Sequence, residues 1–278
     1  MTISWAHSAP DDLRRHHARD AAEREGPLPA DVLQSSLPAQ GTFRGGLLYT
    51  PQNLDRDGVI LYFHGGGFLA GSPETHRCVT AWFAREAGMK VLSARYRLAP
   101  EYPFPAQAED GVAAIAAARS QVEAENAPLF LAGDSAGACV ALWTWCGLPF
   151  ALRARIAGLV LFYGGFGQVS SDSITRHGTA ENGLDHETLD IMYRRLGPQA
   201  VWPKDFAPEV TVPAYVLGAE LDAVFDDSRL LFDALPESTA NSFVTMPGQD
   251  HGFLKGAGKD AAAMQALAAA SQWLAARM

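Results

Sequence analysis

Short runs of apolar residues alternate with alanine-rich helical patterns from about residue 45 to the C-terminus. The apolar runs are rich in Val, Leu and aromatic residues and have the length of strands that are buried on both faces. They predict strands at residues 58–64, 90–96, 128–133, 157–163, 212–219 and 241–246. The stretches between them predict helices near residues 75–87, 105–120, 135–147, 226–235 and 258–277. This alternation predicts an α/β fold in which helices cover both faces of a parallel sheet.

Two segments do not fit this alternation. Residues 1–40 are polar and amphipathic and are interrupted by Pro27, Pro29 and Pro38, whereas residues 165–208 are irregular apart from one helix-like piece, HETLDIMYRRLG. The second segment follows the end of a predicted strand, where the functional groups of parallel sheets collect. We therefore expect both segments to form a small cap on a single domain that spans residues 1–278.

Composition and charge narrow the class of protein. Hydrophobic residues make up 48% and charged residues 19% of the chain, so a large core can form and overall disorder is not expected. The net charge is -9 and no basic run of five or more residues appears, which argues against a nucleic-acid partner. No apolar run reaches the roughly 18 residues of a membrane span, and the N-terminal stretch lacks a signal-peptide core. We expect a cytoplasmic protein without a membrane-spanning segment.

The cysteines give no sign of a metal site. Cys78, Cys139 and Cys146 form no C-x-x-C pair and no His/Cys spacing typical of metal ligands. Two of them lie in apolar surroundings, where a thiol behaves as a small buried hydrophobic group. We expect reduced cysteines and neither a metal nor an organic cofactor.

The stretch LFLAGDSAGACV places Ser135 between two glycines, directly after a predicted strand and before a predicted helix. In this context G-x-S-x-G forms a strand-to-helix turn that presents the serine hydroxyl. The backbone of such a turn is strained, and larger flanking residues would collide with the adjoining strand and helix. The start of the helix also directs its N–H groups and partial positive charge at the site. Ser135 is therefore the candidate nucleophile.

A serine hydroxyl needs a base and an acid that orients the base. In one known chain order both partners follow the serine, the acid first and the histidine last. Three histidines follow Ser135, and only His251 lies beyond the last predicted strand, in the loop MPGQDHGFLKG. His251 is therefore the candidate base.

The candidate acid is Asp222, because it lies closest to the end of the predicted strand 212–219. Asp226 and Asp227 follow soon after it, and we expect them to cap the N-terminus of the next helix instead. The remaining rivals are Glu220, beside the strand end, and Asp250, which neighbours the histidine and would point another way in an extended loop.

The tetrahedral intermediate of acyl transfer also needs hydrogen-bond donors for its oxyanion. The stretch YFHGGGF ends the first strong strand with three glycines, which let the main chain approach a substrate and turn its N–H groups inward. Gly66 and Gly67, together with the N–H of Ala136 beside the nucleophile, are the expected donors, and Gly65 is a third candidate in this loop. His64 precedes these glycines, so we expect it to shape the loop rather than to act as the base.

These residues resemble the hormone-sensitive-lipase-like group of α/β-hydrolases. Besides HGGG and GDSAG, the chain carries YRLAPEYPFPA from residue 96 to 106, LDAVFDDS around Asp222, where the group commonly has D-P-L-x-D-E, and HGF at 251–253. The resemblance runs from about residue 45 to the C-terminus. The chain departs from the group in Ala138, where a glycine is usual, and in an insertion at 165–208 that is shorter and keeps few of the group's motifs.

The resemblance implies an α/β-hydrolase fold, with an eight-stranded, mostly parallel sheet flanked by helices and a small helical cap. It also implies a serine carboxylesterase that hydrolyses small, short-acyl esters through Ser135, His251 and Asp222 without a cofactor. Two alternatives stay open: an amidase or arylformamidase with the same residues, and a non-catalytic binding protein on the same fold.

The expected substrate pocket is apolar, with side chains from the loops near the strand ends. Phe68, Val224 and Phe253 are candidates for it, and Asp134, the second residue of GDSAG, is a fourth candidate substrate contact. The expected partner is a small ester, and the apolar C-terminal helix with the final strand is a candidate homodimer surface.

Overall fold

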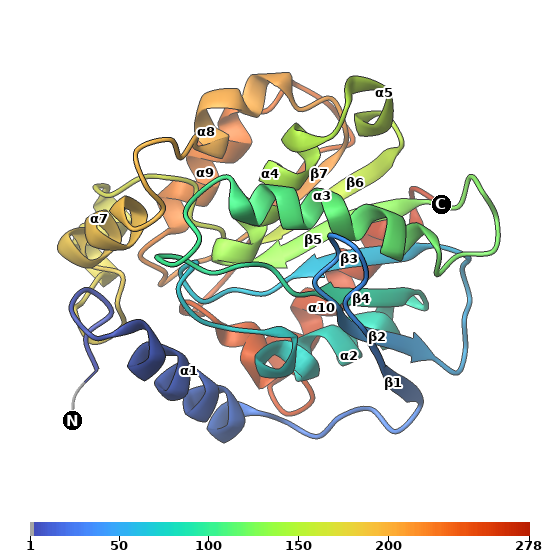
Figure 1. The fold of residues 1–278 in the computed structure, drawn as a ribbon, viewed down its shortest axis with the longest axis horizontal. Helices are drawn as coiled ribbons and strands as arrows, with labels where there is room; N and C mark the ends of the chain where they lie inside the picture. Colours follow the sequence, from blue (N-terminus) through green and yellow to red (C-terminus); the bar gives the residue numbers. More distant parts are fainter. Residues whose placement is uncertain (1–2) are drawn as a thin grey trace.

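Eight strands form one sheet in the computed structural model, which describes residues 3–278 (Figure 1). The strands are β1 (Val32–Leu37), β2 (Gly46–Pro51), β3 (Val59–Phe63), β4 (Lys90–Ala94), β5 (Leu129–Asp134), β6 (Ile156–Phe162), β7 (Ala214–Ala219) and β8 (Ser242–Met246). Their spatial order is β1-β2-β4-β3-β5-β6-β7-β8. The pairs β1-β2 and β2-β4 are antiparallel, and all other pairs are parallel. The predicted mostly parallel sheet is confirmed.

The strands β3 to β8 occur where the apolar runs predict them, whereas neither β2 nor β1 is among the predicted strands. The six residues of β1, VLQSSL, pair with β2 from Val32 opposite Pro51 to Leu37 opposite Gly46. The middle four residues of β1 are exposed, because it is the edge strand and little covers it. An edge strand needs no apolar run, so its pattern resembles that of a polar loop. Residues 32–37 therefore belong to the sheet and not to a cap, which corrects the expectation for residues 1–40.

Helices cover both faces of the sheet (Figure 1). On one face α2 (Arg77–Ala87) packs on β2 and β4 and against α10 (Ala261–Ala275). On the other face α3 (Ala106–Arg119) and α4 (Ala136–Gly147) pack on β3 to β6, and α9 (Phe225–Ala234) packs beside them on β7. The remaining helices are α1 (Pro10–Arg24), α5 (Phe150–Arg153), α6 (Asp172–His177), α7 (His186–Arg194), α8 (Pro203–Phe206) and the short 3-10 helices η1 (Pro73–His76), η2 (Ala207–Glu209) and η3 (Phe253–Gly256).

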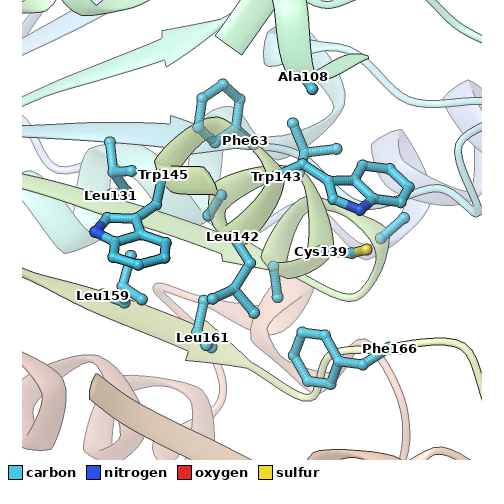
Figure 2. Close-up of a cluster of buried hydrophobic side chains, with 14 of the residues drawn as sticks. Phe63, Ala108, Leu131, Cys139, Leu142, Trp143, Trp145, Leu159, Leu161 and Phe166 are labelled. Carbon is cyan, nitrogen blue, oxygen red and sulfur yellow. The ribbon is translucent and has the colours of Figure 1, made fainter. Parts of the chain in front are cut away.

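Two hydrophobic clusters hold these layers together, one on each face of the sheet. Figure 2 shows side chains of α4 in the larger cluster, gathered with Leu131 of β5 and Leu161 of β6. Alternate residues of a strand point to opposite faces, so Phe130 and Phe162 belong to the second cluster, under α2 and α10. Strands buried on both faces in this way account for the continuous apolar runs in the sequence.

The parallel strands β3, β5, β7 and β8 end at the same edge of the sheet. The HGGG stretch follows β3, Ser135 follows β5, Asp222 follows β7 and His251 follows β8. Helices α1 and α7, which belong to the two segments expected to form a cap, lie on the same side of the molecule in Figure 1. Residues 1 and 2 of the first segment lie outside the described residues. Within residues 3–278 no helix has both the length and the apolar character that crossing a membrane requires.

We predict that Leu161→Ala lowers the free energy of unfolding by about 2–5 kcal/mol, because it leaves a cavity between β6 and α4 that the close-packed core cannot refill. Leu161 is fully buried. Urea unfolding followed by circular dichroism measures the change. Leu230→Ala is the control, since this leucine of α9 is 44% exposed, and its loss should cost less than about 0.5 kcal/mol. Equal effects of the two substitutions would contradict the described core.

Candidate active site

Ser135 lies in a tight turn between β5 and α4. Its φ of 53° and ψ of -124° are backbone angles that a residue with a side chain rarely adopts. A Cβ on Gly133 would lie 2.3 Å from the carbonyl oxygen of Gly137, and a Cβ on Gly137 would lie 2.0 Å from that of Phe63. Both glycines of GDSAG are therefore required by close packing of the main chain, as the sequence pattern predicts.

His251 contacts both Ser135 and Asp222. Its Nε2 lies 2.8 Å from the Oγ of Ser135, and its Nδ1 lies 2.7 Å from an Oδ2 of Asp222. These residues come from three different loops, separated by 116 residues between serine and histidine and by 29 between histidine and aspartate. The structure thus brings together the three side chains that the sequence selects as nucleophile, base and acid.

Asp222 is held in place by the main chain and raises the pKa of the His251 imidazole. It is 1% exposed, and its second carboxylate oxygen accepts a hydrogen bond from the N–H of Val224 at 2.9 Å. Burial acts to lower the pKa of His251, but the charge of Asp222 and its hydrogen bond outweigh burial and raise this pKa above its ordinary value of 6.5. The ring of Tyr163 packs against the imidazole at a centroid distance of 5.3 Å and limits its rotation.

Among residues 3–278 none of the rival carboxylates forms a hydrogen bond with His251. Glu220 accepts a hydrogen bond from the N–H of Gly248, and Asp250 is exposed. Asp226 and Asp227 lie in the first turn of α9, yet neither side chain caps that helix, which corrects the expectation from the sequence. They accept hydrogen bonds from backbone N–H groups of another segment, residues 166–173.

Asp227 attaches the segment after β6 to α9. Its Oδ2 accepts the N–H groups of Phe166 and Gln168, and the hydroxyl of Ser228 donates to the carbonyl of Gly164. Burial raises the pKa of Asp227 to about 7, against the opposing effect of the backbone hydrogen bonds. These contacts fix the start of the insertion beside the serine.

The three glycines after β3 turn the main chain toward Ser135. Gly66 and Gly67 have φ values of 122° and 60°, in the region that glycine enters without strain. Among residues 3–278, the N–H groups of Gly66, Gly67 and Ala136 meet no hydrogen-bond acceptor. The N–H of Gly65 donates to an Oδ1 of Asp134 at 3.1 Å. Gly65 is therefore occupied, whereas the other three N–H groups are free to bind an oxyanion.

Asp134 holds this loop in place through a hydrogen bond to its main chain. It is 2% exposed, accepts from the hydroxyl of Tyr62 at 2.7 Å as well as from Gly65, and lies 3.3 Å from the Nε2 of His76. Burial acts to raise the pKa of Asp134, but the His76 charge and the hydrogen bonds hold it well below its ordinary value. Asp134 borders the cavity, but its carboxylate is engaged by Tyr62, Gly65 and His76, which favours a supporting role in the loop over the substrate contact that the sequence suggests.

His64 shapes the same loop, as its position in the sequence suggests. Its Nδ1 lies 2.9 Å from the carbonyl oxygen of Gly65, and its ring stacks on Tyr96 at a centroid distance of 4.3 Å. Burial, followed by the charge of His76, lowers the pKa of His64 to about 3. A neutral, enclosed imidazole of this kind is a structural group.

A cavity of about 260 Å³ opens above Ser135 and His251. Phe68 and Val224 line it, as the sequence suggests, whereas Phe253 does not. Phe253 packs against Tyr163 in the cluster under α2 and α10, because the 3-10 turn η3 directs it into the core. Within residues 3–278 no group of three or more His, Cys, Asp or Glu side chains is arranged to hold a metal ion.

Other residues of the cavity wall are not evident from the sequence. Leu189, Met192 and Tyr193 of α7 line it, and their spacing of three and four residues in HETLDIMYRRLG is the signal that could have identified this face. Trp5 of the N-terminal segment and Lys255 of η3 also line the cavity. Nothing in the local sequence of Trp5 indicates this, because only the fold brings the N-terminal segment to Ser135, whereas the place of Lys255 in the loop MPGQDHGFLKG beside His251 is a signal that could have identified it.

Known proteins share this architecture. A model of the alpha/beta hydrolase fold family matches residues 60–255. The ester-hydrolase EH1AB1 from the metagenome of Lake Arreo, solved with a derivative of bipyridine phosphonate, is 26% identical, with a TM-score of 0.79 over 99% of this chain and 92% of that chain. An esterase from the bacterial hormone-sensitive lipase family is 25% identical, with a TM-score of 0.79 over 98% of this chain and 92% of that one.

A third structure supports the fold. The esterase of Pyrobaculum calidifontis is 24% identical, with a TM-score of 0.80 over 98% of this chain and 95% of that chain. The resemblance to the hormone-sensitive-lipase-like group is confirmed. Because the family model matches more than half of the chain and includes the HGGG loop, the GDSAG turn and His251, the chain belongs to the alpha/beta hydrolase fold family.

Proposed function

We propose that the protein is a serine carboxylesterase that hydrolyses small esters with short acyl chains. The observation that carries this proposal is the unbroken contact from Asp222 through His251 to Ser135, at 2.7 and 2.8 Å, beside three free N–H groups. This is the arrangement that acyl transfer through a serine needs. Two structures at least 25% identical to this chain are named as an ester hydrolase and an esterase, which supports the choice of esters.

The proposed reaction begins when His251 takes the proton of Ser135 and the hydroxyl oxygen attacks the ester carbonyl. Asp222 holds the imidazole in the tautomer whose Nε2 is free to accept that proton, and its charge stabilises the imidazolium that forms. His251 then protonates the departing alcohol, which leaves an acyl group on Ser135. In the second half of the reaction His251 activates a water molecule, which releases the acid and restores the serine.

The proposed oxyanion donors are the N–H groups of Gly66, Gly67 and Ala136. Ala136 is the first residue of α4, so the partial positive charge at this helix end adds to its N–H. Removal of one such donor commonly lowers turnover by about 10²–10³-fold. The N–H of Gly65 is not in this set, because Asp134 already accepts it.

The cavity supports a small substrate. Its volume of about 260 Å³ lies just below the range of pockets that enclose drug-sized ligands. Phe68, Met192 and Val224 give it an apolar wall beside Ser135. We propose α1 and residues 165–208 as the cap that limits the cavity. A cytoplasmic location and a homodimer through the C-terminal helix remain predictions from the sequence.

We predict that Ser135→Ala lowers kcat for p-nitrophenyl esters by more than about 10⁴-fold, because no other group can form the acyl-enzyme. The measurement is a series of acetate, butyrate, octanoate and palmitate esters, in which wild-type kcat/KM should be greatest for the short chains. Ser238→Ala, at an exposed serine, is the matched control and should behave as wild type. Equal activity of Ser135→Ala and wild type would contradict the proposed function.

We predict that kcat/KM falls as the pH drops, with an apparent pKa above 6.5, because His251 must be neutral to accept a proton and Asp222 raises its pKa. Asp222→Asn removes the charge that raises this pKa, so burial then dominates and the acidic limb moves to lower pH. The same change should lower kcat on the order of 10⁴-fold, because it favours the wrong tautomer.

The pH profile from pH 5 to 9 is compared among wild type, Asp222→Asn and Asp250→Asn, with roughly half-unit steps across the ordinary histidine pKa. Asp250 neighbours His251 in sequence but is exposed, so its substitution should leave the profile in place. A shift with Asp250→Asn and none with Asp222→Asn would exchange the proposed roles of the two carboxylates.

A further inference from the structure

Part of the cavity wall is polar and has no role in the proposed reaction. It is formed by the last turns of α1 and by Lys255 of η3. Lys255 follows His251 by four residues, and its side chain is only 16% exposed. A lysine ammonium is strongly hydrated in water, so an almost enclosed one needs good acceptors around it.

The acceptors that the protein supplies to Lys255 are poor. Its Nζ lies 3.4 Å from an Oδ2 of Asp20 and 3.4 Å from the Nε2 of His17. Ordinary N–H···O hydrogen bonds are about 2.7–3.2 Å long, so both contacts are weak. Three N–H groups of the ammonium thus have little to donate to among residues 3–278.

His17 offers Lys255 a neutral acceptor and no negative charge. Burial, followed by the charge of Lys255, lowers the pKa of His17 well below its ordinary value of 6.5, so the ring is neutral at pH 7. Since Lys255 can only donate, the Nε2 of His17 accepts and the proton lies on Nδ1. That Nδ1 is buried and has no partner among residues 3–278. Neither the ammonium of Lys255 nor the Nδ1–H of His17 therefore has a full set of hydrogen-bond partners among residues 3–278.

Asp20 does not balance the charge of Lys255 either. Its other oxygen, Oδ1, binds the Nε of Arg24 at 2.8 Å, much closer than its 3.4 Å contact with Lys255. One carboxylate is thus shared by two cations. Three further acids border the cavity: Glu181 and Asp250 are exposed to water, where their charges are screened, and the buried carboxylate of Asp134 is engaged by Tyr62, Gly65 and His76. Among residues 3–278 none of these three acids forms a hydrogen bond with Lys255.

The position of Lys255 selects one half of an ester. His251 must reach the departing oxygen to protonate it, so the alcohol portion leaves on the side of the imidazole. Lys255 lines the same cavity as His251 and follows it by four residues in the chain, and its charge, besides burial, acts to lower the pKa of that imidazole. Lys255 can therefore contact a group that is carried by the alcohol portion of the ester.

We propose that Lys255 binds a carboxylate on the alcohol portion of the substrate, so that the protein prefers esters of hydroxy acids over neutral esters. A carboxylate supplies the short, charged acceptors that the ammonium lacks, since both of its contacts with the protein are 3.4 Å long. This inference rests on the proposed esterase function and adds to it the class of alcohol.

The test compares two esters that differ only in this charge, 3-acetoxybenzoate and 3-acetoxybenzamide. Both release acetate, and their alcohol portions have nearly the same size. The readout is the ratio of kcat/KM for the anionic ester to that for the neutral ester, at one fixed ionic strength. A change in the chemical step common to both esters cancels in this ratio.

We expect Lys255→Met to lower the ratio by about tenfold or more, because a charge-assisted hydrogen bond is lost from the anionic ester alone. Lys255→Gln, a second neutral variant, should lower it equally. Lys259→Met is the matched control, since Lys259 is exposed and does not line the cavity, and should keep the wild-type ratio. The same ratio in wild type and both Lys255 variants would overturn the proposal.

A measurement on the wild type alone avoids any effect of substitution on folding. The hydroxy acid 3-hydroxybenzoate should inhibit hydrolysis of the neutral ester more strongly than 3-hydroxybenzamide does, and salt should reduce this difference. Equal inhibition by the two compounds would overturn the proposal. If Ser135-dependent hydrolysis of 3-acetoxybenzamide is itself absent, the proposed function fails instead, so the two failures are distinguishable.

Discussion

The close packing of the main chain around Ser135 is the constraint on which the candidate site depends. A single added carbon on Gly137 would overlap the carbonyl oxygen of Phe63 at the end of β3, and one on Gly133 would overlap the carbonyl oxygen of Gly137 in α4. These close approaches let Ser135 hold a φ of 53°, and they set the N–H of Ala136 beside the loop after β3. The strain of such a residue is of order 1–3 kcal/mol, and the buried strands on both sides of the turn hold it in place.

Asp134 joins the turn to the glycine loop. It follows Gly133 in the chain, yet it accepts the N–H of Gly65 and the hydroxyl of Tyr62, both from the β3 region. One buried carboxylate thus fixes the distance between the candidate nucleophile and the candidate oxyanion donors. The same bond removes Gly65 from the donor set, which leaves Gly66 and Gly67 free. The acid that completes the serine contact, Asp222, is a separate group with a separate partner, His251.

The sequence predicts the central sheet and the three contacting side chains because both depend on local signals. Strands buried on both faces appear in the sequence as apolar runs. The glycines of GDSAG and HGGG are required by main-chain geometry. The edge strand β1 gives no such signal, since four of its residues are exposed. Their motifs assign Phe253 and Asp134 to substrate binding. The fold directs Phe253 into the core, and hydrogen bonds from Tyr62 and Gly65 engage the carboxylate of Asp134. Trp5 and His17 reach the cavity only through tertiary structure, which no local pattern encodes.

The central claim is that His251 activates Ser135 as a nucleophile. The most direct measurement is the reaction of the protein with an organophosphate, followed by mass spectrometry of the peptides. We expect that one equivalent is bound, that the label lies on the peptide containing Ser135, and that His251→Ala reacts far more slowly. A protein that takes up no label, or takes it up at another residue, would contradict the role of Ser135 and favour a binding protein on this fold.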